Sequence, residues 1–290
     1  MTPKMHHLVW NVDPEIFSLG PFQPRWYGFF FALGFVLGYE IMAQFYRRER
    51  RNLENLSHLL LYLLLGTIIG ARLGHVFLYQ PEYYLAHPWE ILMVWQGGLA
   101  SHGGFAGVMM AVYLYLKTYR DVSFIELADR LAIPCLLTAT LIRIGNFFNS
   151  EILGTPSNLP WAIVFARVDD IPRHPAMLYE AVAYFLVFCT LCVAYWKTTI
   201  IHFPGRVFGT ALATGFLARF MIEFVKENQV PLEKDMLLNM GQLLSIPFVL
   251  AGLYLIYASR RKPPTPARWT NAKPAKLGDS LADNPTRSEN

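Results

Sequence analysis

The stretch of the chain that decides its fold, residues 127–154, reads LADRLAIPCLLTATLIRIGNFFNSEILG. A helix needs about 20 apolar residues to cross a bilayer, and residues 127–148 have that length. Arg143, Asn146, Asn149 and Glu151 stand at the end of this run. Because a charge at membrane depth costs about 2.5 to 3.5 kcal/mol on insertion scales, such polar groups need a partner or a ligand. The stretch predicts a membrane-spanning helix that ends in a candidate site.

The composition of the whole chain also predicts a membrane protein. Hydrophobic residues make up 54% of its 290 residues and charged residues only 16%, against about 25% charged residues in soluble domains. We therefore expect an all-α, polytopic integral membrane protein with about seven transmembrane helices and a small head region outside the membrane. The predicted spans are residues 26–46, 57–79, 98–116, 127–148, 177–197, 207–225 and 240–258.

Basic residues in the short loops predict the orientation of these spans. They cluster after the first, third, fifth and seventh spans, whereas residues 80–97 contain no Lys or Arg. By the positive-inside rule, the N-terminus lies outside and the C-terminus inside. The formal net charge of +4 reflects these inner flanks, which favours contact with anionic membrane lipids and requires no nucleic-acid partner.

A histidine at the start of the third span is a candidate catalytic base. His102 stands between two glycine pairs, Gly97-Gly98 and Gly103-Gly104, where a bare backbone allows a substrate to approach closely. Histidine can accept a proton near neutral pH. The alternative is a structural histidine beside glycines that serve only tight helix packing.

Other polar residues in the spans allow two interpretations each. Arg219 and Glu223, at i and i+4, share a helix face, so they form either a self-satisfied ion pair or part of a substrate site. Arg72 projects into the bundle or toward the outer leaflet. Glu180 is expected to cap or orient the start of the fifth span, and Tyr27, on position alone, to anchor the first span at the interface.

The sequence gives no reason to expect a metal or an organic cofactor. Cys135, Cys189 and Cys192 all fall inside predicted spans, and the CxxC formed by the last two has no second pair and no nearby histidine. We expect these cysteines to pack as inert apolar residues. No HExxH, GxSxG or P-loop motif occurs.

Seven motifs, in order from about Trp26 to Ile256, resemble those of the bacterial prolipoprotein diacylglyceryl transferase family. They are RWYG, GARLGHVFLY, VWQGGLASHGG, IRIGNFFNSEILG, RHPAMLYE, ARFMIEF and MGQLLSIPF. The resemblance implies an enzyme that moves the diacylglyceryl group of phosphatidylglycerol to the lipobox cysteine thiol of a prolipoprotein signal peptide. The products are a thioether-linked lipid and glycerol phosphate, in the first step of bacterial lipoprotein maturation. The implied location is the bacterial inner membrane, with a periplasmic N-terminus and a cytoplasmic C-terminus.

The resemblance also assigns roles to individual residues. It implies catalytic roles for Tyr27, His102, Arg219 and Glu223, and phosphatidylglycerol binding by Arg143, Asn146, Glu151 and Gly154. These residue types suit the reaction, because the thiolate is the reactive form of cysteine and a base promotes its formation. An arginine offers a planar, permanently charged partner for the phosphate.

The implied organisation has three parts. Residues 1–25 form a periplasmic N-terminal arm, and residues 26–258 form a transmembrane catalytic domain with a periplasmic head region at about 149–176. Residues 259–290 form a disordered cytoplasmic tail, because they are rich in proline and polar residues.

Two rival functions remain at the level of the sequence. A polytopic lipid or small-molecule transporter would line a pathway with the same polar residues, but transporters often carry internal repeats and broken helices in matched halves, which are not evident here. A noncatalytic membrane scaffold would leave the intramembrane arginine and histidine without a purpose.

Overall fold

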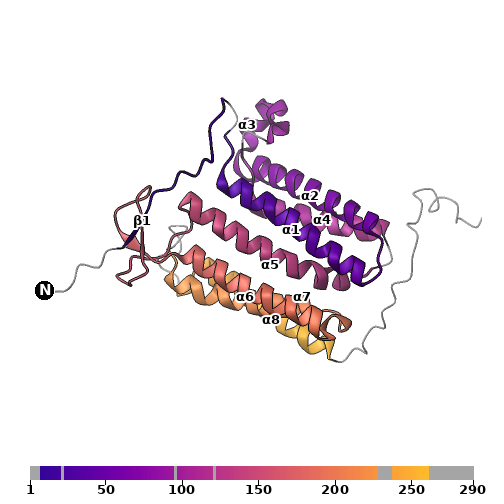
Figure 1. Cartoon of the computed structure of the whole chain (residues 1–290). Helices are drawn as coiled ribbons and strands as arrows, with labels where there is room; N and C mark the ends of the chain where they lie inside the picture. The colour runs from indigo at the N-terminus through magenta and orange to yellow at the C-terminus, as the bar shows by residue number, and fades with distance from the viewer. Residues whose placement is uncertain (1–6, 21–22, 95–96, 120–121, 228–236, 261–290) are drawn as a thin grey trace, which may run out of the picture. The chain divides into compact units, whose positions relative to one another are not determined.

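The structure, a computed structural model, describes residues 7–20, 23–94, 97–119, 122–227 and 237–260 (Figure 1). Most of the predicted disordered tail, from residue 261 onward, lies outside the described residues. The described chain divides into two compact units. The first contains residues 7–42 and 128–260, and the second contains residues 43–127.

Among the described residues, six helices are long and apolar enough to cross a membrane. They are α1 (Trp26–Arg48), α2 (Leu53–Tyr79), α5 (Phe124–Asn149), α6 (Ala176–Lys197), α7 (Arg206–Ile222) with its extension η4 (Glu223–Val225), and α8 (Met240–Ser259). Each coincides with a predicted span. The remaining predicted span forms α4 (Ser101–Thr118), a helix of 18 residues whose glycines and histidine lower its apolarity. The prediction of a polytopic membrane protein is confirmed.

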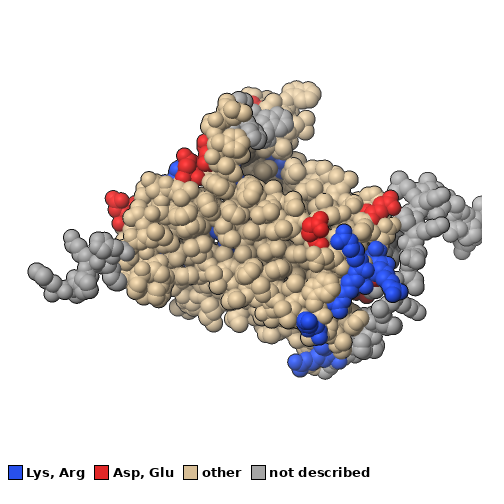
Figure 2. Space-filling model, in the orientation of Figure 1, with Lys and Arg blue, Asp and Glu red and all other residues tan. Residues whose placement is uncertain are grey.

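The exposed surface of these helices is apolar, as expected for helices that face lipid. Val36, Val193 and Leu250 are each about 60% exposed, whereas the charged Asp129 and Glu180 are completely buried. Figure 2 shows the same property, since most of the visible surface carries neither acidic nor basic residues. Because a charge buried among apolar helices is costly, the contacts of these charged residues indicate a candidate functional site.

The second unit is held together by glycines on two helices. Gly66, Gly70 and Gly74 of α2 lie against Gly103 and Gly107 of α4, and a Cβ atom at any of them would collide with the facing backbone. Small residues at this spacing let two helices approach closely in a membrane. The short helices α3 (Pro81–Ala86) and η1 (Pro88–Leu92) follow α2 in this unit.

Glycines also allow close helix packing at two places in the first unit. Gly34 of α1 lies against Thr138 of α5, whose Oγ1 donates a hydrogen bond to the Gly34 carbonyl at 3.3 Å. Gly209 of α7 faces Gly252 of α8, and a Cβ on Gly209 would lie 2.8 Å from the Gly252 carbonyl oxygen. The short η3 (Ile200–His202) lies between α6 and α7 in sequence.

A small sheet in the first unit is the part of the fold that the sequence pattern did not predict. Strand β1 (Leu8–Trp10) pairs in parallel with β2 (Ile163–Phe165), and β2 pairs antiparallel with β3 (Pro172–Arg173). Phe165 of β2 and Met177 of α6 are fully buried in one hydrophobic cluster, and the Trp10 ring centroid lies 4.1 Å from that of Phe147. Segment 150–175, here called the head, is thereby fastened to the end of α5.

Candidate functional site

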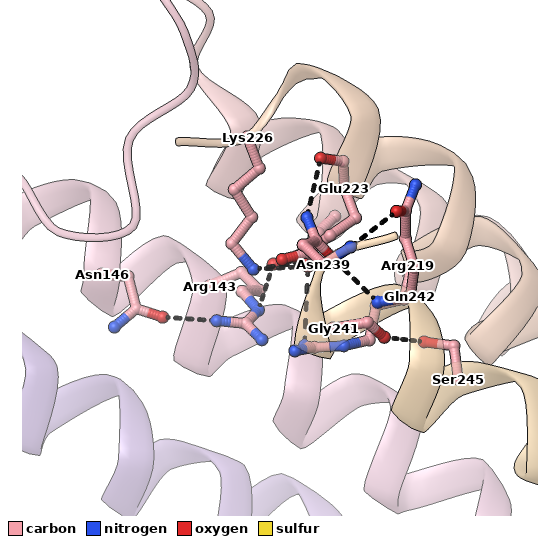
Figure 3. A network of polar contacts seen from close by, with 10 residues as sticks. Arg143, Asn146, Arg219, Glu223, Lys226, Asn239, Gly241, Gln242 and Ser245 are labelled. Atoms are coloured by element: carbon pink, nitrogen blue, oxygen red, sulfur yellow. Dashed lines mark hydrogen bonds and ion pairs between the residues drawn. The ribbon is translucent and has the colours of Figure 1, made fainter. Parts of the chain in front are cut away.

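The site begins where α5 ends, at the predicted polar cluster. Arg143 and Asn146 lie one turn apart, and Arg143 Nη1 donates to Asn146 Oδ1 at 3.2 Å (Figure 3). Asn146 Nδ2 in turn donates to Glu151 Oε2 at 3.1 Å. Arg143 and Asn146 therefore lie on one face of α5, and Glu151 continues the chain of polar contacts.

Backbone geometry turns Glu151 back toward the helix. Ser150 and Ile152 both have positive φ, of 56° and 60°, a region that non-glycine residues rarely adopt. The Glu151 amide donates to the Asn146 carbonyl at 3.0 Å, which closes the helix end with a left-handed turn at Ser150. Because strained residues of this kind concentrate at functional sites, the turn supports a role for Glu151.

Tyr27 lies at the same end of α5 because Gly145 has no side chain. A Cβ on Gly145 would lie 3.1 Å from the Tyr27 Cα atom and 3.2 Å from its ring. The glycine therefore admits the first turn of α1 against the last turns of α5. Tyr27 was expected on position alone to be an interfacial anchor, but the structure places it beside the polar cluster.

A buried carboxylate forms the centre of the site. Glu180 of α6 is completely buried, and its oxygens lie 2.7 Å from Arg143 Nε, 3.8 Å from Arg219 Nη1 and 3.7 Å from Lys226 Nζ. None of these contacts has the alignment of a hydrogen bond, so they are ion pairs held mainly by charge. Glu180 therefore joins cations from α5, α7 and the segment after α7, instead of capping its own helix.

Arg219 and Glu223 do not form the self-satisfied ion pair that was one of the two interpretations of their spacing. Arg219 contacts Glu180, while Glu223 Oε2 lies 3.2 Å from Lys226 Nζ. The i, i+4 relation itself is kept, because the Glu223 amide donates to the Arg219 carbonyl and the 3-10 turn η4 begins only at Glu223. The two side chains differ in the partners that other segments bring to them, which are Glu180 for Arg219 and Lys226 for Glu223. We call Arg143, Glu180, Arg219, Glu223 and Lys226 the charge cluster; it carries one net positive charge.

The N-terminus of α8 closes the cluster on one side. Gly241 lies against the Glu223 carboxylate so closely that a Cβ atom would overlap it. Asn239 and Gln242 form a capping box, and Asn239 Nδ2 donates to the Glu223 carbonyl at 3.4 Å (Figure 3). The positive end of the α8 helix dipole therefore faces a buried carboxylate, which it stabilises.

Gly154 has a structural position in this site. Its amide donates to the His174 carbonyl at 2.9 Å, and its backbone bridges Lys226 on the other side. A Cβ there would lie 2.6 Å from both the His174 and the Val225 carbonyl oxygens. Only glycine fits between these two segments, so Gly154 fixes the backbone that presents Lys226.

Arg173 fastens the same segment from the head. Its side chain contacts Asp169 Oδ2 at 2.5 Å and Glu227 Oε2 at 3.2 Å. The hydrogen bond from Arg173 holds the pKa of Asp169 below its ordinary value. The head, through Arg173 and Gly154, therefore positions the residues that follow α7.

His102 belongs to the second unit. It lies in the first turn of α4 and its side chain is exposed. The backbone before it is held by α2, because the Ala100 amide donates to the Ala71 carbonyl at 2.9 Å. Arg72 donates to the carbonyls of Ile91 at 2.9 Å and Gly97 at 2.6 Å, and also to those of Glu90 and Gly98.

Two residues of the cluster were missed or undervalued by sequence reasoning. Glu180 was expected to cap its helix, although it is the only acidic residue of α6 and the cost of burying it was a signal of function. Lys226 follows the predicted sixth span and was not considered. Within the described residues, no group of three His, Cys, Asp or Glu side chains is arranged to hold a metal ion.

Comparison with known proteins gives a consistent result. A sequence model of the family described as prolipoprotein diacylglyceryl transferase matches residues 14–258. The chain is 48% identical over 253 residues to the phosphatidylglycerol–prolipoprotein diacylglyceryl transferase of Chloroherpeton thalassium, covering 87% of this chain and 94% of that protein. The enzyme of the same name from Tolumonas auensis is 49% identical over 255 residues, covering 88% and 98%. That from Porphyromonas gingivalis is 42% identical over 273 residues, covering 89% and 96%.

Proposed function

Because the chain belongs to the prolipoprotein diacylglyceryl transferase family, we propose that its charge cluster binds the phosphate of phosphatidylglycerol for transfer to a prolipoprotein cysteine. Family membership makes this protein a membrane transferase of lipoprotein biosynthesis. The transporter and scaffold alternatives are thereby set aside. The roles of individual residues and the orientation in the membrane are part of the proposal.

The observation that carries the proposal is the bonding of Arg143. Its Nε contacts Glu180 and its Nη1 contacts Asn146, whereas Nη2 donates no hydrogen bond to any residue that the structure describes. The side chain is 15% exposed and lines an apolar groove, so a ligand can reach it. A guanidinium held by two partners, with one nitrogen that has no described acceptor, suits a phosphate oxygen.

The charge balance of the cluster supports the same ligand. Within the charge cluster three cations face two carboxylates, which leaves one positive charge, while Glu151 is linked to Arg143 only through Asn146. A phosphodiester with one negative charge would neutralise this positive charge. Since buried unpaired charge is costly, the site favours an anion over a neutral or zwitterionic headgroup.

The reaction needs charge stabilisation and proton transfer. The thiolate sulfur attacks the carbon of the diacylglycerol part that bears the phosphate, a C–S bond forms there, and the C–O bond of the same carbon breaks with its electron pair leaving on glycerol phosphate. Arg143 and Arg219 would stabilise the charge that grows on the leaving phosphate. The thiol proton passes to a base, for which His102 is our candidate.

The test is an assay with purified protein in phosphatidylcholine vesicles, phosphatidylglycerol and a lipobox peptide. The expected product is a peptide whose mass has increased by one diacylglyceryl unit, with release of glycerol phosphate. A serine in place of the peptide cysteine is the control, because a hydroxyl is a far weaker nucleophile at neutral pH. Absence of product with well-folded protein and the cysteine peptide would contradict the proposed function.

The orientation requires a separate experiment. Basic residues that include Arg47, Lys117, Lys197 and Arg260 stand at helix ends that we propose to be cytoplasmic. A reporter fused after Ser259 should then behave as cytoplasmic, and one fused to the N-terminus as periplasmic. A periplasmic signal from the Ser259 fusion would reject the orientation.

A further inference from the structure

An apolar groove of about 330 Å³ lies between α5 and α7, with Tyr184 of α6 at its wall. Small residues line it, among them Ala139, Ala211 and Gly215. Arg143 is the only charged residue among the described residues of the lining, and it also belongs to the charge cluster. The groove and the proposed phosphate site therefore share one side chain.

The lining follows one face of α5 away from Arg143. It extends back to Ala132, eleven residues earlier, which corresponds to a length of about 16 Å along the helix. Cys135, on this face, is exposed. A molecule that placed its anionic end at Arg143 would find a long, apolar and accessible channel beside it. A phospholipid acyl chain has that chemistry.

Gly215 has no packing reason to be a glycine. A Cβ there would meet nothing closer than Leu136 Cδ2, at 3.9 Å, which is ordinary contact. Gly209 on the same helix is different, because its added Cβ would lie 2.8 Å from the Gly252 carbonyl oxygen. Since glycine is unfavourable inside a helix relative to alanine, its presence at Gly215 calls for another explanation. Because Gly215 has no side chain, the groove is wider at this position.

We propose that Gly215 sets the width of an acyl-chain groove and so determines which acyl chains of donor phosphatidylglycerol are accepted. The inference rests on the proposed function, because it takes the phosphate of the same lipid to lie at Arg143. It assigns to the groove one acyl chain of the donor, in preference to a chain of the surrounding bilayer.

The first experiment enlarges the side chain at this position. Gly215→Ala and Gly215→Leu are compared with wild type in phosphatidylcholine vesicles that contain either dioctanoyl- or dipalmitoyl-phosphatidylglycerol. Gly215→Leu should lower the ratio of dipalmitoyl to dioctanoyl turnover by about tenfold or more, with Gly215→Ala between, because a filled groove excludes the longer chain. Thr214→Leu is the matched control, since Thr214 is exposed on the same turn and does not line the groove.

The second experiment leaves Gly215 intact, so its comparison of two ligands does not depend on how the Gly215 variants fold. Cys189 and Cys192 are replaced by alanine, and Cys135 is then alkylated with N-ethylmaleimide at alkaline pH. Dipalmitoyl-phosphatidylglycerol added to phosphatidylcholine vesicles should slow alkylation at least several-fold. Glycerol 3-phosphate, which lacks an acyl chain, should not. Arg143→Ala should remove the protection.

The outcomes separate this inference from the proposed function. If wild type makes no product with either lipid, the proposed function fails and the inference with it. If wild type makes product but Gly215→Leu keeps the wild-type ratio, Gly215 does not set acyl selectivity and the inference is overturned. Equal Cys135 labelling with and without phosphatidylglycerol would show that the groove holds bilayer lipid only, which also overturns it.

Discussion

Arg72 in the second unit and Arg143 in the first are arginines in apolar helices, and their guanidinium groups are used differently. Arg72 is buried and donates to four backbone carbonyls, those of Glu90, Ile91, Gly97 and Gly98. Arg143 contacts a carboxylate and an amide, and its Nη2 donates to no residue that the structure describes. An arginine whose three nitrogens all donate to carbonyls organises a loop, whereas an arginine with a nitrogen that has no protein acceptor can bind a phosphate.

The largest effect is expected from Arg143. Arg143→Ala should abolish transfer, with a loss of about 10³-fold or more, because arginines that neutralise phosphate charge in transition states contribute effects of that size. Arg143→Lys should recover little, since a lysine cannot offer the planar fork. The measurement is turnover with dipalmitoyl-phosphatidylglycerol at matched protein content. Near-normal turnover by the alanine variant would show that Arg143, like Arg72, is not needed to bind the phosphate.

His102 tests whether the second unit contributes chemistry as well as structure. His102→Gln should fold, because glutamine keeps a polar side chain of similar reach, but it should lose about a hundredfold to ten-thousandfold in rate. If His102 is the base, the defect should shrink as the pH approaches the ordinary thiol pKa of about 8.5, where thiolate forms without help.

The control for His102 is the pH profile itself. A structural histidine would give a loss that follows protein stability and is independent of pH. A defect of constant size in a well-folded variant would therefore argue against the base role, and attention would move to Glu151, Tyr27 or Glu223.

Arg72 should affect stability first. Arg72→Ala removes the donor of four carbonyls, and the bonds to Ile91 and Gly97 alone, at about 1.5 to 3 kcal/mol for each hydrogen bond to a charged group, predict a loss of about 3 kcal/mol or more. The half-life of folded protein on heating should shorten, and turnover should fall in proportion to the folded fraction. A folded, stable variant with abolished turnover would instead place Arg72 in the chemistry.

The smallest effect is expected at the head. The Arg173 hydrogen bond depresses the pKa of Asp169, so its contribution is present above the unfolded value of about 3.9 and is lost as the pH falls through the folded value. The contribution should be less than about 1 kcal/mol, because Asp169 is partly exposed. Acid should speed amide hydrogen exchange in residues 163–173, after correction for intrinsic rates. Asp169→Asn should be faster already at pH 6, and equal rates there would contradict this pairing.

Much of the membrane architecture could be predicted from local signals. The length of each apolar run, and the polar residues that bound it, predicted the six described helices that are long enough to cross a membrane and also α4. The predicted ends lie within a few residues of the observed ones. The start of α2 was predicted late because the Asn52 cap, which accepts from the Glu54 amide at 2.9 Å, was not recognised. The sheet was missed, because strands of two or three residues from distant parts of the chain carry no periodic signal.

The sequence by itself determined that this protein spans a membrane, to which family it belongs, and which polar residues need an explanation. It did so because apolar length and ordered motifs are properties of the chain read in one dimension. Only the tertiary structure decided that Glu180 contacts three cations, of which Lys226 is one. Only the tertiary structure decided that all three guanidinium nitrogens of Arg72 have protein acceptors, whereas Nη2 of Arg143 has none among the described residues. Those facts depend on contacts between side chains of different helices. Such contacts, rather than the neighbours in the sequence, determine the energy of a buried charge.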